Sequence, residues 1–480
     1  MHNSKLFQLL RTLEASEIPW LHKFLKSPYY NSNPQYLQLF EYIRKYYPNL
    51  EHAKLSKEIV FKKLYPKETF TPQKMRKLMH ELATLVEEFL VVHSIKNNRF
   101  EHRKRLIAEL GRRNHYKAFE KETNSLLQSL EQQEKRDENH FLERYQLRKQ
   151  LFAHPLTERG REGKDKLLKI SEELDYFFFL QKLNLDTALE SNARVFAADS
   201  RVNLIDEINV QIKNQNSILP KELLLHQLIN ELLRENKKDD FFDHVFEQYK
   251  QIKNQLTLKS KSDIIQSLIS FTSLKLNQGK TEYVSKQLAL YKTGLADKVL
   301  LRNQKMTNNT FSNIISCAAF EEEYDWAEWF LETYKNYLEI SGREEIVTFN
   351  KANINFKKGN FLLALNHLSS IHFDSILYRI NSKVLLIECY FELFLNDDTY
   401  FELLMAQSKA FEKFIRREKN LTKEKKQQLL NFTFIVKKLA KSSYGFSPIE
   451  PIIKEISDTK NIAVKSWIMQ KINSLKTEST

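Results

Sequence analysis

Glycine is scarce in this chain: 8 of its 480 residues are glycine. Parallel α/β enzymes need glycine in tight strand-to-helix turns and in the loops that hold phosphate groups. The sequence contains no Gly-x-x-x-x-Gly-Lys, no Gly-x-Gly-x-x-Gly and no Gly-x-Ser-x-Gly, which are the signatures of phosphate loops and nucleophile elbows. The composition therefore argues against a doubly wound α/β enzyme.

Proline is also unevenly placed, with none of the 10 prolines between Pro220 and Pro448. Helix interiors reject proline because it lacks an N–H group and its ring clashes with the preceding turn. So long a stretch without proline predicts one helix after another. With 42% hydrophobic residues, the chain has enough apolar surface to fold over most of its length. We expect an all-α protein.

Cysteine and long apolar runs are missing too. The two cysteines, Cys317 and Cys389, are too few for a disulfide scaffold and fit a reducing compartment. Both have apolar neighbours, which favours buried thiols over nucleophiles. No stretch of ~18 apolar residues could span a membrane, and the first residues do not resemble a secretory signal. We therefore expect a cytoplasmic protein with no membrane partner.

Metal-binding and catalytic patterns are absent among the 13 histidines, which include no His-Glu-x-x-His motif. His367 and His372 are five residues apart, a spacing that places them poorly for sharing a metal ion on one helix face. We expect no catalytic residue, no metal site, no cofactor and no small-molecule substrate, and hence a protein that is not an enzyme.

Positive charge is concentrated in two stretches. Residues 96–121 contain nine Lys/Arg and three Glu, a balance of +6, and residues 413–441 contain ten Lys/Arg and two Glu, a balance of +8. These two balances account for the whole formal net charge of +14. Such clusters are one requirement for binding an acidic partner, although they also suit ordinary solvated helix faces. The candidate partner-binding residues are Arg103, Lys104, Arg105, Arg112, Arg113, Arg416, Arg417, Lys425 and Lys426.

Changes in pattern divide the chain into four parts: an N-terminal helical domain (1–99), a helical-hairpin region with one long buried helix (100–220), degenerate repeats (221–441), and a linker with a C-terminal capping helix (442–480). In the first part, Asn33-Pro34 and Thr71-Pro72 each combine an N-cap residue with a proline at the first helical position. Ser56 is a third predicted cap. Residues 155–164 and 442–460 contain the turn-forming residues of loops.

One segment of the second half has a regular order of small, aromatic and apolar residues: Ala352, Gly359, Phe361, Ala364, Leu368 and Ile371. This order resembles a tetratricopeptide repeat, in which small residues let two helices cross closely and glycine permits the turn between them. Weaker matches begin near Phe242, Thr281, Tyr324 and Phe401, at intervals of 37–43 residues around Phe361, against ~34 in that family. The resemblance implies a right-handed α-solenoid of lengthened helical hairpins.

Two functions follow from these features. A stack of helical hairpins is typical of a protein-interaction scaffold or adaptor that binds another protein or peptide. The alternative is a nucleic-acid-associated or transcription-regulatory protein, because residues 55–90 are loosely similar to the helices of winged-helix domains. That alternative requires a β-hairpin after them, for which residues 91–98 are poorly suited. A third feature, the segment 321–330 with Trp326 and Trp329, is either part of the core or an aromatic anchor for a partner.

Overall fold

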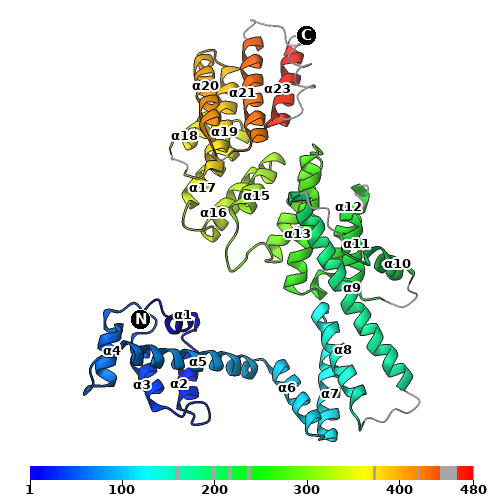
Figure 1. Ribbon diagram of the computed structural model, residues 1–480. Coiled ribbons are helices and arrows are strands. Elements are labelled where there is room, and N and C mark those ends of the chain that lie inside the picture. Colours follow the sequence, from blue (N-terminus) through cyan, green and yellow to red (C-terminus); the bar gives the residue numbers. More distant parts are fainter. Residues whose placement is uncertain are drawn as a thin grey trace. The chain divides into compact units, whose positions relative to one another are not determined.

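The computed structural model describes residues 1–156, 163–196, 202–214, 219–234, 239–370, 374–419, 421–443 and 462–478. This described part consists of helices joined by turns (Figure 1), with no β-strand and one isolated antiparallel bridge between Arg302 and Lys305. No helix within it is long and apolar enough to cross a membrane. The prediction of an all-α fold is confirmed.

The chain forms two compact units, one made of residues 1–133 and 143–171 and the other of residues 134–142 and 172–480. The helices that lie wholly within the first unit are α1 (Lys5–Thr12), α2 (Ile18–Lys26), α3 (Pro34–Ile43), η1 (Arg44–Tyr46), η2 (Ala53–Leu55), α4 (Lys57–Leu64), α5 (Pro72–Asn97), α6 (Arg99–Arg112) and α7 (Tyr116–Glu131). Two further helices, α8 (Glu138–Ala153) and α9 (Gly163–Phe196), contain residues of both units.

Helix α5 lies at the centre of the N-terminal helices, in contact with α1, α2, α3 and α4. Met75, Leu78, Leu82 and Phe89, which recur at helical spacing, are all buried in the same hydrophobic cluster. Side chains three and four residues apart share one side of a helix. These four residues therefore form one apolar stripe of α5 that faces the core.

Two of the three predicted N-caps form. The Asn33 side chain accepts a hydrogen bond of 3.0 Å from the Gln35 amide, and Ser56 Oγ accepts one of 3.3 Å from Ile59. Thr71 occupies the N-cap position of α5 but makes no capping bond. Its hydroxyl instead donates to the carbonyl oxygen of Thr69, 3.3 Å away. The proline at the first helical position is present all the same.

Residues 91–97 continue α5 as regular helix. They do not form the β-hairpin that a winged-helix domain would place after its second helix. The similarity of residues 55–90 to such a domain is therefore limited to the helices themselves.

The second unit continues with α10 (Ile205–Asn214), α11 (Lys221–Arg234), α12 (Asp239–Ile252), η3 (Lys253–Gln255), α13 (Leu258–Asn277), α14 (Tyr283–Ala296), α15 (Asn308–Phe320), α16 (Tyr324–Tyr334), η4 (Lys335–Tyr337), α17 (Arg343–Lys357), α18 (Phe361–Ser369), α19 (Ile376–Phe394), α20 (Tyr400–Arg417), α21 (Lys423–Ser443) and α23 (Lys465–Glu478). Consecutive helices pack in pairs: α11 with α12, α13 with α14, α15 with α16, α17 with α18, and α19 with α20. The first helices of neighbouring pairs also touch, as in α15 with α17 and α17 with α19.

The pair α17–α18 contains the residues singled out in the sequence. Ala352 and Ala364 are fully buried and belong to one hydrophobic cluster with Leu368. Phe361 is partly buried against the same cluster, and Gly359 has the positive φ of +82° that glycine adopts readily. Ile371, the last of these positions, lies outside the described residues, as do residues 157–162 and 444–460 of the two predicted loops.

Helix α9, expected from the sequence to be buried between neighbouring helices, is buried over part of its length. Leu180 and Leu183 are buried in a cluster with apolar residues of α10 and α11. Leu167, Leu168 and Leu185 are more than half exposed. The sequence shows that leucine occurs on more than one face of this helix, but it does not show which of those faces a neighbouring helix covers.

Candidate functional site

The first basic cluster lies on α6 and is largely engaged in ion pairs. Arg103 contacts Glu122 of α7 at 3.2 Å, and Lys104 contacts Glu101 and Glu143 at 3.1 and 3.2 Å. Both cationic side chains are mostly covered, with 20% and 26% of their surface exposed. A partner that approached them would have to compete with carboxylates already in place, so these two residues serve mainly to join α6 to its neighbours.

The remaining residues of the first cluster are exposed. Arg112 and Arg113 both contact Glu109, at 2.8 and 3.4 Å. Hydrogen bonding from Arg112 holds the pKa of Glu109 below its usual range. Arg105 is exposed and forms no ion pair with any described residue. The two guanidinium groups at the end of α6 thus share one carboxylate, which leaves this surface with a weaker positive charge than the sequence suggests.

The second basic cluster is arranged differently. Arg416 and Arg417 are the last two residues of α20 and are exposed, and no carboxylate of the described residues lies within ion-pair distance of either. Lys425 donates a hydrogen bond of 2.8 Å to the neutral Gln428, and the half-buried Lys426 forms no ion pair within the described part of the chain. Because α20 packs against α21, the end of one helix and the start of the other present these cations together. We refer to Arg416, Arg417, Lys425 and Lys426 as the α20–α21 basic surface.

The lysines of this surface are placed against the helix dipole. Lys423, Lys425 and Lys426 stand in the first turn of α21, with Glu424 as its one acidic residue. A helix N-terminus carries a partial positive charge and is stabilised by acidic side chains and destabilised by basic ones. Helix stability alone therefore does not account for these lysines, whereas an anionic partner at this point would offset the repulsion.

The aromatic segment near α16 is mostly core. Phe330 is fully buried, and the ring of Trp326 stacks on it at 5.6 Å between centroids. The ammonium group of Lys292 lies 4.9 Å from the centre of the Trp326 ring. Trp329, by contrast, is 52% exposed. Of the two interpretations made from the sequence, Phe330 fits the one that places the segment in the core. Within residues 321–330, Trp329 is the residue that presents a large exposed ring.

The cysteines are poor candidates for chemistry. Cys317 and Cys389 are both buried and free. Burial raises the pKa of the Cys317 thiol to about 12, and burial likewise raises that of Cys389. A thiol acts as a nucleophile in its deprotonated form, so neither is activated at neutral pH. Among the described residues no group of three or more His, Cys, Asp or Glu side chains is placed to hold a metal ion; His372 lies outside them.

A polar pocket in the second unit was not singled out from the sequence. It lies between α9, α11 and α13 and is lined by Thr187, His226 and Asp263, among others. Part of it is recognisable in retrospect, because Asp263, Ser267 and Ser270 recur at helical spacing on α13. The contributions of the other two helices come from positions ~40–80 residues away, which no local pattern connects.

Comparison with protein-family models, with curated protein sequences and with solved structures finds no match to this chain.

Proposed function

We propose that this protein is a non-enzymatic interaction scaffold whose α20–α21 basic surface binds an acidic segment of a partner protein. The proposal rests above all on the contrast between the two basic clusters. Arg103 and Lys104 are neutralised by carboxylates of their own unit, whereas Arg416 and Arg417 have none within reach among the described residues. Charge that is not satisfied internally and lies on a rigid helix end suits recognition of an anionic group.

The helical pairs from α11 to α20 support the scaffold part of the proposal. The two helices of each pair pack against each other, and in several cases the first helix of a pair also touches the first helix of a neighbouring pair. An array of this kind, which we infer to be a degenerate tetratricopeptide-like solenoid, offers a long surface made of many helices. Two free cysteines favour a reducing, cytoplasmic setting.

Arginine also recognises phosphate groups, so the same surface supports a second candidate function, association with nucleic acid. In that case the contacts come from the α20–α21 basic surface and not from a winged helix, because residues 91–97 are helical. The protein partner is favoured here because the chain's formal net positive charge is confined to two short stretches and the remaining charges balance.

A charge-reversal comparison tests the proposal. Arg416→Glu/Arg417→Glu reverses the charge of the two unpaired arginines, and Arg112→Glu/Arg113→Glu is the matched control, since it makes the same change in charge at another exposed helix end. Each tagged variant is purified from its native cells with its partners, with and without nuclease. We expect a defined set of acidic proteins that survives nuclease, is lost in the first variant and is retained in the control.

Two outcomes would overturn the proposal. Equal recovery from both variants would remove the α20–α21 basic surface from binding. Recovery that collapses with nuclease in the unaltered protein would instead establish the nucleic-acid function. Helix content measured by circular dichroism shows whether both variants remain folded.

A further inference from the structure

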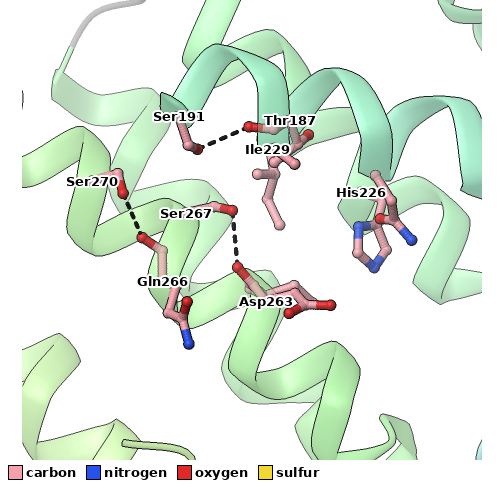
Figure 2. A pocket seen from close by; sticks show the side chains of 11 residues that line it. Thr187, Ser191, His226, Ile229, Asp263, Gln266, Ser267 and Ser270 are labelled. Atoms are coloured by element: carbon pink, nitrogen blue, oxygen red, sulfur yellow. Dashed lines mark hydrogen bonds between the residues drawn. The ribbon is translucent and has the colours of Figure 1, made fainter. Parts of the chain in front are cut away.

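A pocket of about 400 Å³ lies between α9, α11 and α13 within the second unit. Asn184, Thr187 and Ser191 line it from α9, His226 from α11, and Asp263 and Ser267 from α13. Figure 2 shows the imidazole of His226 and the carboxylate of Asp263 directed toward the space between these helices. The volume is within the range of about 300–1,000 Å³ that is typical of small-molecule sites.

Two buried polar side chains of this pocket form no side-chain hydrogen bond with the described residues. Thr187 is 7% exposed, and its hydroxyl oxygen is buried without a hydrogen-bond partner. His226 is 4% exposed; its ring nitrogens form no hydrogen bond with any described residue, and Nε2 lies 3.8 Å from Glu222. Buried polar side chains are nearly always hydrogen-bonded, so the unpartnered hydroxyl of Thr187 in the lining of this cavity points to a ligand there.

The serine hydroxyl groups of the pocket have already donated their protons and can only accept hydrogen bonds from a ligand. Ser191, Ser267 and Ser270 donate their protons to backbone carbonyl oxygens one turn earlier, at 2.8–2.9 Å, as the dashed lines in Figure 2 show. Each serine oxygen keeps lone pairs that can accept a further hydrogen bond. A ligand that satisfies them must therefore supply hydrogen-bond donors.

Asp263, an exposed residue, gives the pocket a carboxylate that no described residue pairs. Its carboxylate forms no ion pair and accepts no side-chain hydrogen bond from the described residues. The cationic side chains that act on it electrostatically are Lys259, Arg302 and His226. Of these, Lys259 is paired with Glu138, and Arg302 donates to Gln266 at 2.8 Å. Neither cation is therefore committed to Asp263.

We propose that this pocket binds a small organic amine, with its ammonium group on Asp263 and further N–H or O–H groups on the serine oxygens. Carboxylates bind ammonium groups through charge-assisted hydrogen bonds, which are about twice as strong as neutral ones. Thr187 then receives the hydrogen-bond partner that no described residue provides. Glu222 does not compete for the ligand, because it is buried and accepts a hydrogen bond of 2.7 Å from Ser260.

Titration calorimetry with 1,4-diaminobutane as the probe, and with uncharged 1,4-butanediol as its isostere, tests the proposal on the full chain. We expect saturable binding of the diamine, at least tenfold weaker binding of the diol, and at least tenfold loss of diamine affinity in Asp263→Asn. The matched control is Asp240→Asn, which removes the same charge from an exposed position of α12 and should leave the affinity unchanged.

A second variant separates a ligand site from a merely structural cluster. Thr187→Val keeps the shape of the side chain and removes its unpartnered hydroxyl, so it should raise the melting temperature of the free protein while lowering the affinity for the diamine. No saturable binding of the diamine, equal affinity in Asp263→Asn, or equal binding of the diol would overturn the proposal.

Discussion

The indole N–H of Trp467 donates a hydrogen bond of 2.8 Å to Oε1 of Glu392, a buried carboxylate on α19. The other oxygen of Glu392 accepts one of 2.6 Å from Lys471. Both donors lie on α23, so one carboxylate joins the last helix to the core. Ile468 and Ile472 of α23 are buried in the same hydrophobic cluster, and Figure 1 shows α23 beside α21. Helix α23 thereby covers the end of this cluster.

Removal of the Trp467 side chain is predicted to release α23. Trp467→Ala deletes a ring that is 4% exposed and leaves Glu392 without one of its two donors, which should cost about 3–5 kcal/mol. Hydrogen exchange of the α23 amides is expected to accelerate by at least a hundredfold. Trp329→Ala is the control, because that ring is 52% exposed and its loss should change exchange little. Equal protection of α23 in both variants would contradict this role.

Glu388 is predicted to make the stability of α19 depend on pH. Burial raises the pKa of this carboxyl to about 8, with Lys357 opposing the increase and Glu392 adding to it. Since the folded state holds the proton more tightly than the unfolded chain, the free energy of unfolding falls as pH rises from about 4.5 to about 8. A pKa difference of one between the folded and unfolded states corresponds to about 1.4 kcal/mol of that free energy.

Glu388→Gln should therefore remove that loss. We expect the variant to be more resistant to urea than the unaltered protein at pH 8.5 and to differ little from it at pH 5, as followed by hydrogen exchange within α19. Glu402→Gln, at an exposed position of α20, should show no such pH dependence. A pH profile that is unchanged by Glu388→Gln would show that another group is responsible.

The crossing of α17 and α18 depends on two small side chains. Ala364 is fully buried against the cluster that contains Ala352. Ala364→Trp has no space to occupy and should destabilise this pair by about 1–3 kcal/mol or more through overpacking. Leu363→Trp, at the neighbouring and 52% exposed position, is the control for adding an indole. If the two variants melted at the same temperature, the assigned packing of this helical pair would be wrong.

Helix positions could be read from the sequence because they depend on local chemistry. The caps Asn33 and Ser56 act within a few residues, and each proline would disrupt only the helical turn in which it lies. The apolar stripe of α5 has a helical period that can be read directly from the sequence. Thr71 fits the same pattern, yet its hydroxyl donates to Thr69. A capping residue type predicts where a helix begins more reliably than it predicts the hydrogen bond itself.

The functional features depend on contacts between helices, which cannot be read from the order of residues along the chain. Arg103 and Arg416 look alike as members of basic clusters, but only the fold places Glu122 of α7 beside the first. The exposed leucines of α9, such as Leu168, are a second case, because a leucine is buried only where another helix packs over it. The pocket around Asp263 is a third case, because it needs three helices at once.

Site-specific photo-crosslinking in the native cells shows directly whether the α20–α21 basic surface contacts an acidic protein. A benzoylphenylalanine at Gln427, an exposed position of α21 beside Lys426, keeps every cation of that surface, and the same residue at the exposed Gln128 of α7 is the control. We predict nuclease-resistant crosslinks to an acidic protein from position 427 and not from position 128. Crosslinks to nucleic acid alone, or equal crosslinking from both positions, would contradict the proposed function.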